Sequence, residues 1–141
     1  MPRLSPGKCR VKLTLGLGCD RGTPAATIIA AIDEALATCS ASPVDIGLAA
    51  SINLKANEYG LLQAMHHFGW RLRFYSAAEL ATVAVPNPSE TVRRHTGTPS
   101  VSEAAALLAA GNDTALLLIE KYKRRGPDGR NATVSIARII E

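Results

Sequence analysis

Polar and apolar residues alternate near the start of the chain. From Arg10 to Leu15 the apolar positions Val11, Leu13 and Leu15 recur at every second residue. This period of two predicts a half-buried β-strand over residues 10–15. Three glycines, a cysteine and a charged pair follow, and they predict a loop over Leu17 to Thr23.

After this loop the apolar residues recur at a longer spacing, which is typical of a helix. Thr23 is expected to be the N-cap of a helix and Pro24 its first residue, because proline is favoured at that position. The helix is expected to end before Pro43. Its predicted apolar face recurs at three- and four-residue spacing and consists of Ile28, Ile32, Leu36 and Cys39.

The middle of the chain repeats this order. A short apolar run from Asp45 to Ser51 predicts a second strand, and Asn57 is expected to cap a helix that Gly69 ends. The buried stripe of that helix is predicted to be Leu61, Met65 and Phe68. A third strand is expected over residues 71–75, followed by a helical turn over residues 76–80.

The last third predicts two helices and then two strands. A small helix is expected from Pro88 to about His95, and a second one begins near Thr98-Pro99-Ser100 and runs to Gly111. Ser100 and Glu103 have the spacing of a capping box. Two extended runs, 114–122 and 132–139, flank the loop sequence Arg-Gly-Pro-Asp-Gly, which predicts an antiparallel hairpin.

Strands that alternate with helices predict an α/β fold. We expect three layers: a mainly parallel mixed sheet, helices on both of its faces, and a C-terminal antiparallel hairpin. In such sheets ligands bind beyond the carboxyl ends of the strands. The loops Leu17 to Thr23 and Ser51 to Asn57, with Ser76, are expected to gather there.

Composition narrows the class of protein. The chain has 141 residues, of which 47% are hydrophobic, so it is expected to form a single domain over residues 10–141 after a flexible N-terminus over 1–9. The net charge is +4, which suits acidic ligands, but aromatic residues make up only 4% and no nucleic-acid motif is present. No apolar run approaches the length of a membrane span. We therefore expect a cytoplasmic protein that binds neither nucleic acid nor membrane.

The cysteines predict neither a disulfide framework nor a metal site. Cys9, Cys19 and Cys39 are odd in number and form no Cys-x-x-Cys pair. We expect no metal and no cofactor.

The glycine-rich loop has an unusual spacing. Gly16, Gly18 and Gly22 give G-x-G-x-x-x-G, which is neither the dinucleotide fingerprint nor a Walker loop. Glycines before a helix still offer free amides to an anion. Anion binding and a purely structural tight turn both stay open, and a similar Gly97-Thr98-Pro99 begins a later helix.

Side chains beside these loops could carry chemistry. Cys19 precedes a helix start and neighbours Arg21, an environment that favours a thiolate, although a small residue that merely fills the loop is the commoner case. Lys55 and Glu58 follow the second strand and could supply a cation and a general acid or base. Equally, Glu58 could stabilise its own helix and Lys55 could be a solvated charge.

Six segments in order resemble the CobE / CbiG C-terminal domain family of cobalamin biosynthesis. They cover nearly the whole chain and are Gly16-Leu-Gly-Cys-Asp-Arg-Gly-Thr23, Ala50-Ser-Ile-Asn-Leu-Lys-Ala-Asn-Glu58, Tyr75-Ser-Ala-Ala-Glu-Leu80, Val85-Pro-Asn-Pro-Ser-Glu90, Thr96-Gly-Thr-Pro-Ser-Val-Ser-Glu-Ala-Ala-Ala106 and Ala132-Thr-Val-Ser-Ile-Ala-Arg138.

The resemblance implies a role in building the corrin ring. The larger CbiG protein opens a δ-lactone of cobalt-precorrin-5A and releases acetaldehyde, whereas stand-alone CobE proteins belong to the aerobic pathway. A chain of 141 residues leaves no room for the additional N-terminal part of CbiG, which favours the free-standing kind. The implied ligand is a precorrin or a hydrogenobyrinic-acid-type intermediate, with other enzymes of the pathway as partners. The oligomeric state stays open.

The same resemblance implies the site residues. Lys55 and Glu58 are the implied catalytic pair. The implied ligand-binding residues are Gly18, Cys19, Arg21, Gly22, Thr23, Ser51 and Thr98. The chain departs from the family pattern at Asn53 and Asn57, where the family tends to have aspartate. Because asparagine cannot act as a carboxylate base, hydrolysis would fall to Glu58.

Three functions follow from these observations. The first is binding or hand-over of a corrinoid intermediate without turnover. The second is hydrolysis of a precorrin-5A-type lactone, in which Glu58 activates water and Lys55 or Arg21 stabilises the oxyanion. The third is a regulatory module that binds nucleotide phosphates through the glycine-rich loop.

Overall fold

A central sheet of five strands organises the molecule. The computed structural model describes residues 12–85, 90, 100–111 and 116–139. The strand order is β3-β2-β1-β5-β4. The strands are β1 (Leu13–Cys19), β2 (Ile46–Ile52), β3 (Leu72–Tyr75), β4 (Leu116–Arg125) and β5 (Asn131–Arg138). β1, β2 and β3 are parallel, whereas β5 runs antiparallel to both β1 and β4.

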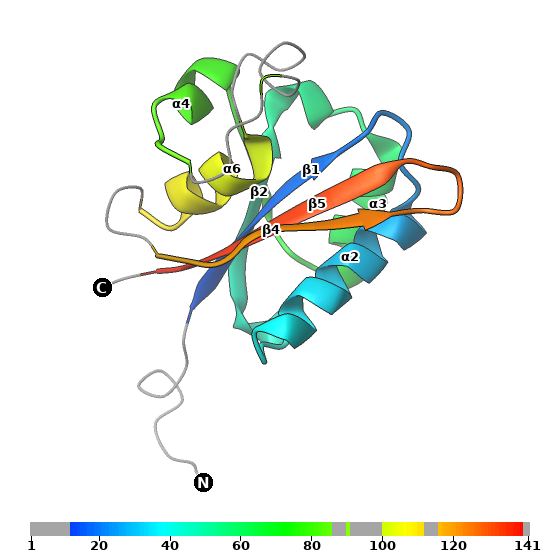
Figure 1. Ribbon diagram of the computed structural model, residues 1–141, viewed down its shortest axis with the longest axis horizontal. Helices are drawn as coiled ribbons and strands as arrows, with labels where there is room; N and C mark the ends of the chain where they lie inside the picture. Colours follow the sequence, from blue (N-terminus) through cyan, green and yellow to red (C-terminus); the bar gives the residue numbers. More distant parts are fainter. Residues whose placement is uncertain (1–11, 86–89, 91–99, 112–115, 140–141) are drawn as a thin grey trace, which may run out of the picture.

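Helices cover both faces of this sheet (Figure 1). α2 (Ala25–Thr38) and α3 (Tyr59–Phe68) pack on one face. α4 (Ala77–Ala81) and α6 (Val101–Ala109) pack on the other. The expected three-layer α/β fold with a mixed sheet and a C-terminal hairpin is therefore confirmed.

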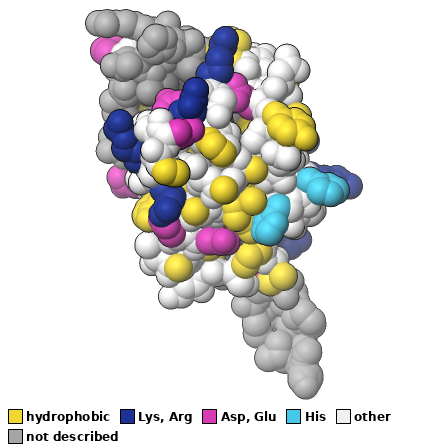
Figure 2. Space-filling view, turned by 90° about the vertical axis from the view of Figure 1, so that its right-hand side faces the viewer, with side chains coloured by type: hydrophobic (Ala, Val, Ile, Leu, Met, Phe, Trp, Pro, Cys, Tyr) yellow, Lys and Arg dark blue, Asp and Glu magenta, His cyan; other side chains and the backbone are white. Residues whose placement is uncertain are grey.

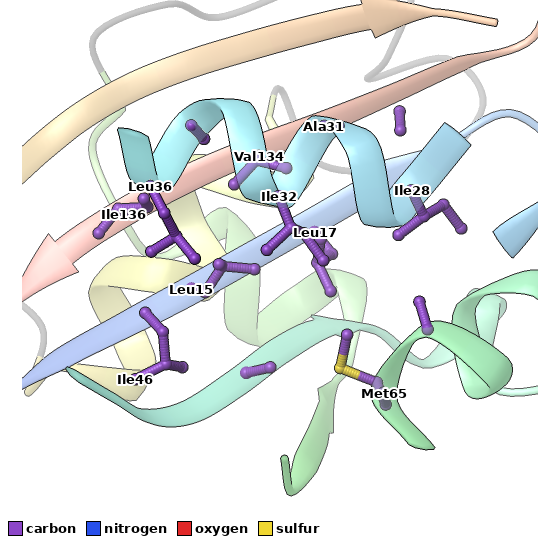
Figure 3. Close-up of a cluster of buried hydrophobic side chains, with 14 of the residues drawn as sticks. Leu15, Leu17, Ile28, Ala31, Ile32, Leu36, Ile46, Met65, Val134 and Ile136 are labelled. Atoms are coloured by element: carbon purple, nitrogen blue, oxygen red, sulfur yellow. The ribbon is translucent and has the colours of Figure 1, made fainter. Parts of the chain in front are cut away.

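The alternation that predicted β1 divides its side chains between the two layers. Leu13, Leu15 and Leu17 enter the core beneath α2, where Figure 3 shows Leu15 and Leu17 near Ile32. Leu15, Leu17 and Ile32 are almost completely buried, and each such side chain contributes about 1.5–3 kcal/mol to the free energy of folding. These buried contacts fix the position of α2 on the sheet over β1.

Small residues of β1 let α6 lie close on the opposite face. A Cβ added to Gly16 would lie 1.9 Å from the carbonyl oxygen of Ser102, so no larger residue fits there. Thr14, two residues before Gly16 and on the same face of β1, donates its hydroxyl proton to the carbonyl oxygen of Ala106 at 2.7 Å. Gly16 therefore serves helix packing rather than a loop.

The predicted glycine-rich loop is wrong in extent. β1 continues to Cys19 because its pairing with β5 extends to Cys19 and Ala132. Gly16 and Gly18 thus lie inside a strand, and only Gly22 has a positive φ, of 78°. The connection to α2 is a short turn, and the premise of a phosphate-binding glycine loop at residues 16–18 does not hold.

Two predicted helix caps are each wrong by one residue. α2 has Pro24 at its N-cap instead of Thr23, whose hydroxyl donates to the carbonyl oxygen of Asp20 at 2.7 Å. α3 has Glu58 at its N-cap instead of Asn57. Neither N-cap residue makes a side-chain cap hydrogen bond.

The later elements agree with expectation in type and order. Ser76 and Glu79 form a capping box at α4, whereas Ser100 makes no cap hydrogen bond at α6 and the expected box there is wrong. The hairpin strands are displaced from the predicted 114–122 and 132–139 to Leu116–Arg125 and Asn131–Arg138. The small helix expected over 88–95 and the Gly97–Pro99 helix start fall outside the described residues, Glu90 excepted.

Candidate functional site

The carboxyl ends of β1 and β2 bring two loop segments together. β1 leads through a turn into α2, and β2 leads through a 3-10 turn, η2 (Asn53–Lys55), into α3. Because β1 and β2 are parallel neighbours, both connections lie at the same edge of the sheet. We call residues 19–24 and 53–58 together the carboxyl rim.

The starts of α2 and α3 are in contact behind this rim. A Cβ added to Gly60, in the first turn of α3, would lie 2.1 Å from the carbonyl oxygen of Thr23 and 3.0 Å from the amide nitrogen of Ala25. Only glycine allows such an approach. The first turns of α2 and α3, whose leading amides have no partner within their own helix, therefore lie in contact.

A third helix begins close to the same strand end. A Cβ added to Gly18 would lie 3.9 Å from the Cβ of Val101, the first residue of α6. The start of α6 thus lies near the carboxyl end of β1, on the sheet face opposite α2 and α3. Thr98, which precedes α6, lies outside the described residues.

The carboxylate of Glu58 is hydrogen-bonded to a backbone amide of the rim. The backbone N–H of Gly22 donates to Oε1 of Glu58 at 3.0 Å, and this bond joins the two segments of the rim. Glu58 is half-buried, and its side chain makes no cap hydrogen bond to its own helix. At the N-cap of α3 its charge still lies beside the positive end of that helix, while its carboxylate accepts a hydrogen bond from the neighbouring turn.

Cys19 lies among the charges of the rim as a neutral thiol. Burial raises its pKa to about 11, and the acidic side chains of Glu58 and Asp20 also raise the pKa, whereas Lys55 lowers it. Of the two interpretations that the sequence left open for Cys19, a reactive thiolate is therefore disfavoured at neutral pH, and a side chain that fills the turn is favoured. Lys55 and Glu58 thus lie close enough to Cys19 for their charges to affect its pKa.

Two residues implied as ligand-binding are buried beneath the rim. Ser51 is 0% exposed and donates its hydroxyl proton to the carbonyl oxygen of Leu17 at 2.7 Å. Thr23 is 1% exposed, and its hydroxyl faces carbonyl oxygens of the chain. Both side chains position the rim from within, while Arg21 and Gly22 are exposed at its surface.

The tip of the β4–β5 hairpin braces the rim, a contact that sequence reasoning missed. Asp20 accepts hydrogen bonds from the backbone N–H and the side-chain amide of Asn131, at 2.7 and 3.1 Å. Arg130 donates from Nε to the carbonyl oxygen of Arg21 at 2.9 Å and ion-pairs with Asp128. The partners are more than 100 positions apart in sequence, so no local pattern signals the contact.

The described part of the chain contains neither a candidate metal cluster nor a candidate membrane-spanning helix. Within it, no group of three or more His, Cys, Asp or Glu side chains is arranged to hold a metal ion. None of the helices in the described ranges has the length and hydrophobicity needed to cross a membrane.

Comparison with known proteins points to one pathway. Residues 13–137 match the family model described as cobalamin synthesis G C-terminus. The chain is 43% identical over 116 residues to Protein CobE from Sinorhizobium sp, which covers 81% of this chain and 75% of that protein. It is 39% identical over 127 residues to a cobalt-precorrin-5A hydrolase from Priestia megaterium, which covers 90% of this chain but only 32% of the hydrolase. The chain thus spans about a third of that hydrolase.

Solved structures share the fold. The crystal structure of CobE, a protein from the cobalamin biosynthetic pathway, matches with a TM-score of 0.80 and 32% identity over 99% of this chain and 96% of that chain. Cobalamin biosynthesis protein chiG from Agrobacterium tumefaciens matches with a TM-score of 0.66 and 32% identity over 92% and 99%. This chain thus matches nearly the whole length of both solved chains.

Proposed function

We propose that this chain, which belongs to the cobalamin synthesis G C-terminus family of cobalamin biosynthesis, binds a corrinoid intermediate at the carboxyl rim and hands it to another enzyme of the pathway. The ligand would be a precorrin or a hydrogenobyrinic-acid-type macrocycle, whose edge carries several carboxylates. A basic chain with clustered amides suits such a polyacid.

One observation carries this proposal: the hydrogen bond between the amide of Gly22 and the carboxylate of Glu58. It demonstrates that a rim amide has the geometry to hold a carboxylate. The starts of α2 and α3 add further free amides beside it, and Lys55 adds a cation. A ligand carboxylate can bind such donors directly or exchange with Glu58.

Binding without turnover agrees with the rim side chains, few of which could act as a nucleophile or a general base. Cys19 is protonated at neutral pH because its pKa is raised to about 11. Asn53 and Asn57 stand where family members tend to have aspartate, and an amide cannot accept a proton as a general base. Of the rim residues in the second segment, Glu58 alone carries a carboxylate.

Titration with a defined corrinoid tests the proposal. Hydrogenobyrinic acid is added to the purified chain while its visible absorption spectrum and the heat of binding are recorded. Lys55→Gln should weaken binding about fivefold, which corresponds to about 1 kcal/mol for a partly exposed ion pair. Arg71→Gln is the matched control. It removes one exposed charge just before β3, at the amino ends of the parallel strands and away from the carboxyl rim. A wild-type chain that neither changes the spectrum nor releases heat contradicts the proposal.

Hydrolysis is the second candidate, and the similarity to the cobalt-precorrin-5A hydrolase of Priestia megaterium favours it. Glu58 would take a proton from water that attacks the lactone carbonyl, and Lys55 or Arg21 would stabilise the oxyanion that forms. The ring C–O bond would then break to leave a carboxylate, and the proton held by Glu58 would pass to the departing alkoxide oxygen. Incubation with cobalt-precorrin-5A and an assay for acetaldehyde test this reaction. A Glu58→Gln variant that releases acetaldehyde at the wild-type rate would remove Glu58 from the reaction.

A further inference from the structure

The segment that carries Lys55 and Glu58 also exposes three large apolar side chains. Tyr59 is 73% exposed, Leu54 60% and Leu62 42%. Tyr59 and Leu62 are three residues apart at the start of α3, so they are neighbours on one face of the helix. Leu54 lies in η2, just before the same helix. We call these three residues the apolar face.

The fold has no need of these side chains for its core. α3 packs on the sheet through its opposite side, where Leu61, Ala64 and Met65 are buried. Exposed leucine and tyrosine side chains within one short segment leave apolar area in water without stabilising the chain. Figure 2 shows hydrophobic side chains exposed among charged ones on the side of the molecule where α3 lies in Figure 1.

The apolar face is continuous with the charged part of the rim. Leu54 is adjacent to Lys55 in η2, and Tyr59 follows Glu58 directly. The amide of Leu62 donates to the carbonyl oxygen of Glu58 at 3.1 Å, which keeps Leu62 one turn from the rim. A single stretch of nine residues, 54–62, thus offers apolar surface, an aromatic ring, a cation and a carboxylate.

We infer that the apolar face is the surface against which the flat macrocycle of the ligand lies. The inference rests on the proposed function. It adds a binding surface for the ring of the ligand, because the amides and cations of the rim account only for its carboxylates. A small polyacid would need only amides and cations, whereas a conjugated ring with carboxylates at its edge needs an apolar contact of its own. Tyr59 stacks on the ring, Leu62 and Leu54 cover its adjoining part, and the peripheral carboxylates reach Lys55 and the amide of Gly22.

Binding of hydrogenobyrinic acid to matched variants tests this inference. Tyr59→Ala should raise the dissociation constant about tenfold, because a stacked aromatic contact and its buried area are lost together. Leu62→Ser should raise it several-fold. Val44→Ser is the control, because Val44 is 69% exposed but lies in the turn before β2, at the other end of that strand. Its dissociation constant should equal that of the wild type.

The salt dependence of binding separates apolar from ionic contacts. Raising the ionic strength should weaken binding to the wild type and to Tyr59→Ala by the same factor, and should weaken binding to Lys55→Gln less. Thermal unfolding of each variant confirms that the surface changes leave the fold intact.

Three results would overturn the inference. If the wild type binds hydrogenobyrinic acid but Tyr59→Ala and Leu62→Ser bind it equally well, the proposed function survives and the apolar face has no part in it. If the wild type binds none, the proposed function fails and the inference fails with it. If sedimentation shows a wild-type dimer that Leu62→Ser converts to a monomer, a second copy of the chain covers the face instead.

Discussion

Replacing Gly60 by alanine should separate the two helix starts on which the carboxyl rim depends. The new Cβ would lie 2.1 Å from the carbonyl oxygen of Thr23 and 3.0 Å from the amide of Ala25, both of them backbone atoms. Backbone cannot rotate away as a flexible side chain can. Either α3 moves outward or the turn before α2 shifts, and both movements disturb the packing of α2 against α3.

The magnitude follows from two opposing effects. Overpacking of a well-packed site destabilises a protein by about 1–3 kcal/mol, and contact with rigid backbone places this site at the upper end. Alanine in place of glycine returns up to about 1 kcal/mol of helix propensity. The free energy of unfolding should therefore fall by about 2 kcal/mol, and the melting temperature should fall by roughly 8 °C for a chain of this size.

Urea unfolding monitored by circular dichroism measures the effect, with Gly47→Ala as the control. A Cβ on Gly47 would meet only the carbonyl oxygen of Leu13, at an ordinary distance of 3.8 Å, so this variant should be as stable as the wild type or slightly more stable. Gly60→Ala should also bind hydrogenobyrinic acid more weakly. If the two variants unfold at the same urea concentration, the starts of α2 and α3 are not held in contact and the geometry of the rim is wrong.

Two further predictions concern buried groups of the rim. Ser51→Ala should lower the free energy of unfolding by about 1–2 kcal/mol in urea, because the carbonyl oxygen of Leu17 loses a buried hydrogen bond; an unchanged midpoint would contradict that bond. The pKa of Cys19 is about 11 in the folded chain against an ordinary value of 9.0, so the unfolded chain loses this proton first. The contribution of Cys19 to stability is then complete below pH 9 and is lost as the pH rises from 9 to about 11. Cys19→Ser should flatten that part of the profile of unfolding free energy against pH, and an equally steep decline in the variant would refute the assignment.

Periodicity predicted β1 and α2 because the large apolar side chains of each lie on one face. The two-residue alternation of β1 and the four-residue spacing of Ile28, Ile32 and Leu36 survive in the structure as the core between sheet and α2. The parallel order of the first strands also placed the ends of β1 and β2 at one edge, which is why Lys55 and Glu58 were expected near the turn before α2.

The missed features depend on contacts between distant parts of the chain. Gly16 and Gly18 suggested a loop because glycine is common in turns, yet the partner that requires a small residue at Gly16 is α6, far along the sequence. Asp20 likewise binds Asn131, which is distant in sequence but lies at the adjoining end of β5. Local propensity does not identify such distant partners, so the sequence predicted the hairpin but not its contact with the rim.

Mapping the bound ligand on the backbone tests the central claim most directly. Amide resonances of the ¹⁵N-labelled chain are recorded before and after addition of hydrogenobyrinic acid. The account predicts that the largest shifts occur at Gly22, Lys55 and Tyr59, with little change at Gly47 and Gly69. Shifts that cluster around Gly47, or that spread evenly over the molecule, would contradict a corrinoid site at the carboxyl rim.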